Sequence, residues 1–218
     1  MKKSILIILG LLIGTLILGY LIFNGKSNTE NAKSHISLYS DDKKTIDVDR
    51  EIFTPEKDVD VLGISLSVEK NTLEKTLGKP IQIEEVHEDA FVADVLYYYY
   101  KFGVIRLEPF DVDIYTVSEI KINKPKYMGP RGIEVGNSIN DVIQKFPNNK
   151  NTRINEEGEK YLYGKFGDEN YGYIVYDKSG EIDSVNYVYG GGGFGSYGLT
   201  FRAHKDVVTE IIIDVCNM

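Results

Sequence analysis

Two stretches of this 218-residue sequence share one pattern of apolar residues, and this duplication limits the possible folds more than any other feature. The first copy consists of Ile64, Leu66, Leu73 and Leu77, and the second, 69 residues later, of Ile133, Val135, Val142 and Phe146. In each copy the last two residues are spaced i, i+4, which places them on one face of a helix. The duplication therefore predicts two short extended segments, each followed by a helix with one apolar face.

The residues around the two predicted helices indicate where each helix begins and ends. Asn137 or Ser138 can cap the second helix, because a side-chain oxygen at this position accepts hydrogen bonds from free backbone N–H groups. Gly78 and Pro80 end the first helix, and Pro147 ends the second.

Stretches typical of β-strands follow each predicted helix. Residues 97–102 (YYYYKF) match residues 161–166 (YLYGKF), and residues 116–122 (TVSEIKI) match both 181–187 (EIDSVNY) and 207–213 (VVTEIII). Turn residues such as those of DKSG separate the apolar runs. The repeated element is therefore a β-hairpin, present once after the first helix and twice after the second.

Pro125 and Pro130 divide the chain, since proline discourages both helices and central strands. We therefore predict two repeated units, residues 53–124 and 131–218, each an α+β layer in which a helix packs on one face of an antiparallel sheet. Residues 24–52 are rich in polar side chains and predict a stalk. The sequence leaves open whether the two sheets join edge to edge into one concave surface.

An apolar segment without charges, residues 4–23, follows Met1, Lys2 and Lys3. About 20 apolar residues in a helix span a bilayer, and the lysines favour a cytoplasmic N-terminus. We therefore expect residues 1–23 to form a single-pass transmembrane signal anchor in the cell membrane, with the two units outside the cytoplasm. A cleaved secretory signal is the alternative, although no Ala-x-Ala cleavage site follows the segment.

The chain is acidic, with a formal net charge of −8. Because the first 23 residues carry two lysines and no acid, the remaining residues have a net charge of −10. An acidic chain without basic clusters is a poor ligand for nucleic acid, so we expect no nucleic-acid partner. Cys216 is the only cysteine, which excludes an intramolecular disulfide, and stability must come from the apolar core.

The alternation of side chains along a strand assigns residues to the two faces of each predicted sheet. One phase contains Tyr97, Tyr99, Lys101, Tyr161, Tyr163 and Lys165, and the other contains Tyr98, Tyr100, Phe102, Leu162, Gly164 and Phe166. A lysine at matching positions of both units is rarely buried. The first phase should therefore face away from the helices, and the second should belong to the core.

The order of these motifs resembles a known group of families. An I-x-(L/V) start, a helix, and strands with Y-x-(Y/F)-G are similar to the small barrel-assembly lipoprotein of the SmpA/OmlA type and to the tandem-domain β-lactamase inhibitory proteins. The resemblance extends over about residues 60–215. It implies a helical layer on an antiparallel sheet, in a module that binds other proteins and has no catalytic residues. This sequence lacks the lipidated cysteine and the disulfides of some relatives.

Residues 189–198 (YGGGGFGSYG) contain the pattern G-x-G-x-x-G twice. A dinucleotide site requires this pattern between a strand and a helix, whereas the residues that follow here, LTFRA, are typical of a strand. We therefore expect a flexible hairpin connection, in which Phe194 and Tyr197 serve as adaptable contact residues.

Residues 84–89 (EEVHED) gather acidic side chains around His87, which favours a solvated acidic loop over a weak site for a divalent cation. The sequence contains no G-x-S-x-G pattern, and Cys216 lies two residues from the C-terminus. We therefore expect no enzymatic activity, no cofactor and no bound metal.

The sequence contains 16 tyrosines and no tryptophan. Tyrosine is enriched at interfaces because it combines rigid contact area with one polar tip, although cross-strand pairing that protects the sheet is an alternative role. We expect a membrane-anchored, extracytoplasmic, non-catalytic module of the inhibitor, immunity or envelope-assembly type, which binds another envelope or extracellular protein. The alternatives are a sensor of a small ligand or cation and an envelope hydrolase. The expected partner-binding residues are Tyr97, Tyr99, Lys101, Tyr161, Tyr163, Lys165, Phe194 and Tyr197.

Overall fold

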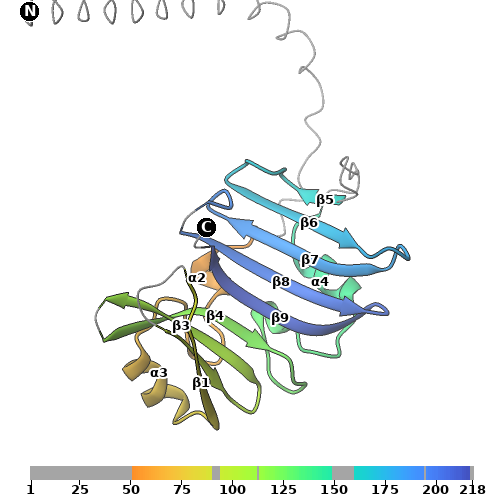
Figure 1. The fold of residues 1–218 in the computed structure, drawn as a ribbon. Coiled ribbons are helices and arrows are strands. Elements are labelled where there is room, and N and C mark those ends of the chain that lie inside the picture. Colours follow the sequence, from red (N-terminus) through yellow and green to blue (C-terminus); the bar gives the residue numbers. More distant parts are fainter. Residues whose placement is uncertain (1–50, 90–93, 112, 149–159, 194, 217–218) are drawn as a thin grey trace, which may run out of the picture. The chain divides into compact units, whose positions relative to one another are not determined.

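The computed structural model describes residues 51–89, 94–111, 113–148, 160–193 and 195–216 (Figure 1). These residues belong to one compact unit, Ile46–Met218. Within these ranges no helix is both long enough and apolar enough to cross a membrane. The predicted membrane span at residues 4–23 and the predicted stalk up to residue 50 lie outside the described residues.

The unit is built around one antiparallel sheet of nine strands, in the order β1-β2-β3-β4-β9-β8-β7-β6-β5. The strands are β1 (Gln82–Val86), β2 (Val95–Tyr99), β3 (Gly103–Asp111), β4 (Ile114–Ile122), β5 (Lys160–Tyr163), β6 (Asn170–Tyr176), β7 (Ile182–Tyr189), β8 (Ser196–His204) and β9 (Val207–Cys216). Each strand from β1 to β4, and from β5 to β9, pairs with the next one along the chain. The sheet therefore consists of two meanders that meet at β4 and β9.

The prediction of two repeated units, each a helix packed on an antiparallel sheet, is wrong, because β4 pairs directly with β9 and the strands of both stretches form one sheet. The pairing runs from Glu119 opposite Asp214 to Ile122 opposite Ile211. These strands also share one core, since Ile120 lies opposite Ile213 and both side chains are fully buried. The two halves of the sequence thus form a single sheet.

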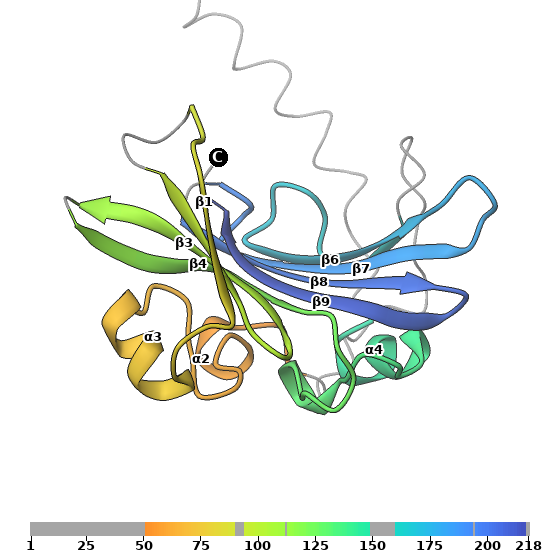
Figure 2. The ribbon, with the colours of Figure 1, turned by 60° about the horizontal axis from the view of Figure 1, so that its bottom comes forward.

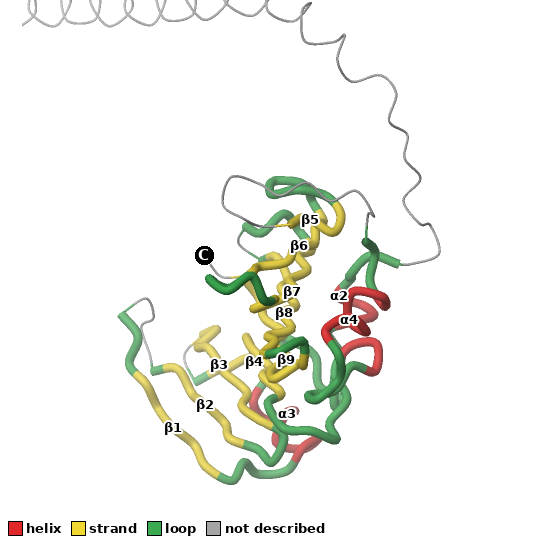
Figure 3. Tube along the Cα trace, turned by 90° about the vertical axis from the view of Figure 1, so that its right-hand side faces the viewer, coloured by secondary structure: helices red, strands yellow, loops and turns green. Residues whose placement is uncertain are grey.

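The helices are short and lie on one side of the sheet (Figures 2 and 3). They are α2 (Pro55–Asp58), α3 (Lys70–Leu77), α4 (Ile139–Lys145) and the 3-10 turn η1 (Pro130–Gly132). Helix α3 contacts β4, whereas α4 contacts β7 and β8. Since α2, α3 and α4 have only 4, 8 and 7 residues, most of the described residues in helices and strands belong to the sheet.

Local signals in the sequence locate α3 and α4 correctly. The Ser138 hydroxyl accepts a hydrogen bond from the Asn140 backbone N–H at 3.2 Å, which confirms Ser138 as the N-cap of α4. Gly78 ends α3 in a left-handed conformation, with φ of 77°, and its N–H donates to the Glu74 carbonyl at 3.0 Å. Of the duplicated apolar residues, Ile64, Leu66, Leu73, Ile133, Val142 and Phe146 are buried.

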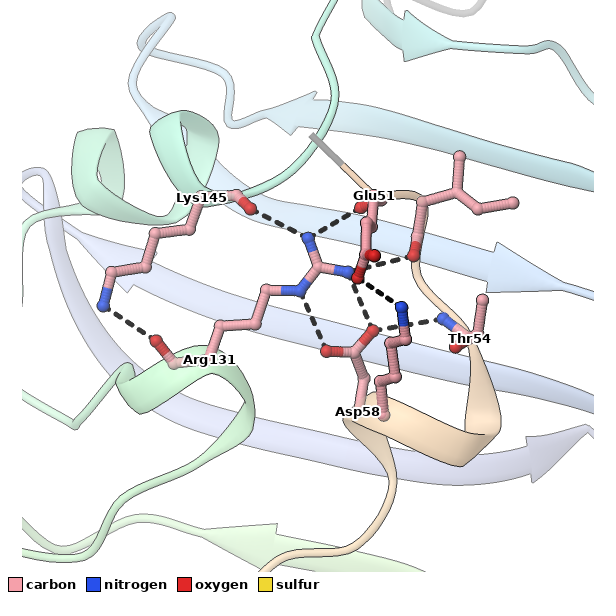
Figure 4. A network of polar contacts seen from close by, with 7 residues as sticks. Glu51, Thr54, Asp58, Arg131 and Lys145 are labelled. Carbon is pink, nitrogen blue, oxygen red and sulfur yellow. Dashed lines mark hydrogen bonds and ion pairs between the residues drawn. The ribbon is translucent and has the colours of Figure 1, made fainter. Parts of the chain in front are cut away.

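Arg131, which follows the predicted break at Pro125 and Pro130, contacts residues from both sides of this break (Figure 4). Its guanidinium forms a bidentate ion pair with Asp58 of α2, with Nε–Oδ1 and Nη2–Oδ2 distances of 2.9 Å. The same group donates to the backbone carbonyls of Glu51, Ile52 and Lys145 at 2.8 to 2.9 Å. We call this set of contacts the Arg131 clamp.

The Arg131 clamp is nearly closed to solvent. The Asp58 side chain is 1% exposed and the Arg131 side chain is 17% exposed. The guanidinium also lies 3.9 Å from the centroid of the Phe146 ring, which is fully buried. Arg131 adopts a left-handed backbone conformation, with φ of 53°, which is uncommon for residues other than glycine. The contacts of its side chain hold it in this conformation.

Candidate functional site

The sheet has a second face, opposite the helices, which we call the open face. On β2, Leu96 and Tyr98 are buried in the core, so the alternation along the strand places Tyr97 and Tyr99 on the open face. Both tyrosines are half-buried. The structure therefore places these two predicted contact residues on the expected face. Their binding of a partner stays a prediction.

Carboxylates hold both tyrosines in place. The Tyr97 hydroxyl donates to Glu88 at 3.0 Å, and the Tyr99 hydroxyl donates to Glu84 of β1 at 2.6 Å. Burial, followed by the hydrogen bond to Glu88, raises the pKa of Tyr97. The hydrogen bond to Glu84 is the main cause that raises the pKa of Tyr99. Arg106, which also contacts Glu88 at 2.7 Å, lies opposite Tyr97 on β3. This network fixes the orientation of the rings.

A row of aromatic side chains lies at the other end of the open face. Tyr161 of β5 lies opposite Tyr173 of β6, with ring centroids 6.3 Å apart. Tyr173 stacks on Tyr171 at 5.9 Å, and Tyr171 meets Phe166 edge to face at 6.1 Å. We call Tyr161, Tyr173, Tyr171 and Phe166 the aromatic row. Its outer member, Phe166, is 76% exposed, so the prediction that Phe166 belongs to the core is wrong.

The prediction that Tyr163 lies on the open face is also wrong, because Tyr163 is only 6% exposed and packs in the core. A β-bulge between Tyr161 and Tyr163 inserts one residue and reverses the alternation of side chains. Tyr163 consequently lies opposite Gly172 and stacks on the buried Tyr187, with ring centroids 6.1 Å apart. Burial raises the pKa of the Tyr163 hydroxyl above the usual range of tyrosine.

The remaining predicted contact residues have different environments. Lys101 is exposed in the turn between β2 and β3, and Lys165 is exposed between β5 and β6. Tyr197 lies within β8, not in the glycine-rich connection, and packs against the core. Phe194 lies outside the described residues. Of these, Lys101 and Tyr197 therefore do not join the aromatic row in one surface.

Polar side chains line the middle of the open face. The Asn186 amide of β7 donates to the Ser184 hydroxyl at 2.9 Å, and the Thr200 hydroxyl of β8 donates to the Asn186 carbonyl oxygen at 2.9 Å. Ser184 and Asn186 are buried although they face away from the helices, which shows that neighbouring side chains cover them.

Two carboxylates meet where β4 and β9 join. Glu119 and Asp214 are directly opposite each other, and Glu119 also lies 3.5 Å from the Lys121 ammonium. Burial is the main cause that raises the pKa of Asp214, and repulsion by Glu119 raises it further. Gly198 provides the space for this group, since a Cβ at residue 198 would lie 2.1 Å from an Asp214 carboxylate oxygen.

The acidic segment around His87 is not a loop throughout, because residues 82–86 form strand β1. His87 pairs with Asp94 through Nδ1 at 3.0 Å. Among the described residues, no group of three or more His, Cys, Asp or Glu side chains has the arrangement of a metal site. The glycine-rich segment connects β7 to β8, two antiparallel strands, and so lacks the helix that a nucleotide-binding loop precedes.

No family model matches this sequence, and no curated protein matches it. Among solved structures, the chain is similar to that of an extracellular protein containing a SCP domain from Bacillus anthracis str. Ames, with a TM-score of 0.43 and 10% sequence identity. The match covers 81% of this chain and 50% of that chain, so it spans about half the length of that protein.

Proposed function

We propose that this protein is a non-catalytic protein-binding module that contacts its partner through the open face of the sheet. The observation that carries the proposal is the asymmetry of the sheet. Helices α2, α3 and α4 lie on one side (Figure 2). The open face presents partly exposed aromatic rings near both of its edges. Tyrosines held in fixed orientations supply contact area at little entropic cost, which suits them to a protein interface.

The positions of the rings support this proposal. Tyr97 and Tyr99 lie near the edge formed by β1, and Tyr161 and Tyr173 lie near the edge formed by β5. Between them, the Ser184, Asn186 and Thr200 side chains are already paired by internal hydrogen bonds. A partner that spans the sheet would therefore bury aromatic rings at both ends without leaving the central polar groups unpaired.

The location outside the cytoplasm is part of the proposal. Its support comes from the sequence, in which an uncharged apolar segment at residues 4–23 follows two lysines. A partner would accordingly be another envelope or extracellular protein, and the module would act as an inhibitor, immunity factor or assembly factor. Protease added to intact cells should degrade residues 51–218. Protection of this region until the cells are lysed would contradict the location.

Photo-crosslinking in the native host tests the binding face. Benzoyl-phenylalanine in place of Tyr99, Tyr161 or Tyr173 should yield crosslinks to another polypeptide. Exposed positions on the helices, Lys75 of α3 and Gln144 of α4, serve as matched controls and should not. Crosslinks from the helix positions alone, or equally from both sides, would overturn the assignment of the open face.

A further inference from the structure

Strand β1 forms one edge of the sheet, and its outer side pairs with no strand among the described residues. It is also strongly exposed: Gln82, Ile83, Glu84 and Glu85 are exposed and Val86 is half-buried. An unpaired edge of this kind presents backbone N–H and C=O groups that can hydrogen-bond an added strand.

The side chains of β1 give this edge a specific character. Ile83 and Glu85 lie opposite the buried Tyr98 and Leu96, so they project to the helix side, while Glu84 projects to the open face. The Ile83 side chain is 49% exposed and the neighbouring Ile81 is 69% exposed. Within the described part of the chain, no cation pairs with Glu85. The edge thus offers the apolar Ile83 and two adjacent carboxylates, of which Glu84 lies on the open face and Glu85 on the helix side.

These charges oppose pairing between two copies of this chain along β1. An antiparallel pair of β1 strands would bring Glu84 and Glu85 close to the same residues of the second copy, and like charges across a strand pair are destabilising. The net charge of −10 beyond residue 23 adds to this repulsion. Negative charge on an edge therefore selects against self-association and in favour of a basic strand.

We propose that the β1 edge binds an extended segment of a partner protein with the core pattern apolar–basic–basic–apolar. In an added strand, successive side chains point to opposite faces. Two adjacent basic residues would therefore meet Glu84 on the open face and Glu85 on the helix side. The flanking apolar residues would pack beside Ile83 and Val86. This is a second surface, distinct from the aromatic rings of the open face, and it adds recognition of a strand to the proposed function.

Peptide binding to the full chain tests the proposal. The probe is a fluorescent eight-residue peptide with the core valine-lysine-lysine-isoleucine, and the control peptide has glutamate in place of both lysines. The lysine peptide should bind at least tenfold more tightly than the control. In the double variant E84K/E85K the preference should reverse, which also shows that the variant is folded. Amide hydrogens of residues 82–86 should exchange more slowly when the lysine peptide is bound.

Several results would overturn the inference. Equal binding of both peptides would show that charge does not select the strand, and unchanged exchange at residues 82–86 would place the peptide elsewhere. The chain itself contains Lys43-Lys44-Thr45-Ile46. Binding that appears only in the variant K43E/K44E would assign the edge to this segment instead of a partner. None of these results affects the crosslinks expected from Tyr161 and Tyr173, so failure of the two proposals can be told apart.

Discussion

The Arg131 clamp should contribute a large part of the folding free energy, and the substitution Asp58→Ala tests this. Among the described residues, Asp58 is the one carboxylate that forms an ion pair with the guanidinium, and the substitution removes it. The substitution also leaves the Thr54 N–H without its acceptor at 3.1 Å. Breaking a buried ion pair by removing one partner costs about 3–5 kcal/mol, because the remaining charge stays buried. Since domains of this size are stable by about 5–15 kcal/mol, the variant should lose roughly a fifth or more of its stability.

Equilibrium unfolding in urea, monitored by tyrosine fluorescence, measures the loss as a lower midpoint at an unchanged slope. The ion pair between Lys57 and Glu51 provides a matched control from the same helix, because these side chains are 54% and 66% exposed. Glu51→Gln breaks this pair, leaves the backbone carbonyl that Arg131 uses, and should not move the midpoint measurably.

A double-mutant cycle separates the ion pair from other effects of the substitution. Arg131→Met combined with Asp58→Ala should cost less than the sum of the two single variants, because no buried charge is left without its partner. A loss below about 1 kcal/mol for Asp58→Ala would refute the reasoning, since it would mean that water solvates the guanidinium in the folded protein.

Three further predictions concern other contacts. The fold raises the pKa of Asp214 above its ordinary value of 3.8. The folding free energy should therefore become less favourable as the pH rises from 3.8 through the raised pKa of the folded state. Asp214→Asn should therefore raise the melting temperature at pH 7, and the gain should shrink below pH 3.8. Gly172→Ala should destabilise by about 1–3 kcal/mol in urea, because the new Cβ would lie 2.8 Å from the buried Tyr163 ring. Ser138→Ala removes the cap of α4 and should cost about 1 kcal/mol; an unchanged midpoint would contradict the hydrogen bond to Asn140.

Local signals in the sequence were sufficient to locate α3, α4 and most strands. The spacing of Val142 and Phe146 and the cap at Ser138 act over a few residues, so they can be recognised without the rest of the fold. The pairing of β4 with β9 is different, because it joins residues about 90 positions apart and is selected by the shared core. A strand with alternating apolar residues does not specify which neighbour it pairs with.

The errors at the candidate site have similar causes. The bulge at Leu162 reverses the alternation of side chains, so a strict period of two placed Tyr163 on the wrong face of the sheet. Phe166 was wrongly assigned to the core because β5 ends at Tyr163, so the alternation of a strand no longer applies at residue 166. Strand β1 was missed because glutamate is depleted in strands, and only an edge position tolerates two of them. The role of Arg131 was also missed. The available signal was a single arginine between Pro130 and Gly132, in a stretch whose other residues are typical of a linker.

The central claim, binding through the open face, is tested most directly with the double variant Tyr99→Ala/Tyr161→Ala. Two quantities are measured on this variant: its affinity for the crosslinked partner and its unfolding midpoint. Both rings are half-buried on the open face, so the affinity should fall roughly tenfold or more while the midpoint stays near that of the parent. Tyr163→Ala is the contrasting control and should lower the midpoint, because this ring is in the core. Unchanged affinity in the double variant, or a midpoint that falls as far as in Tyr163→Ala, would contradict binding through the open face.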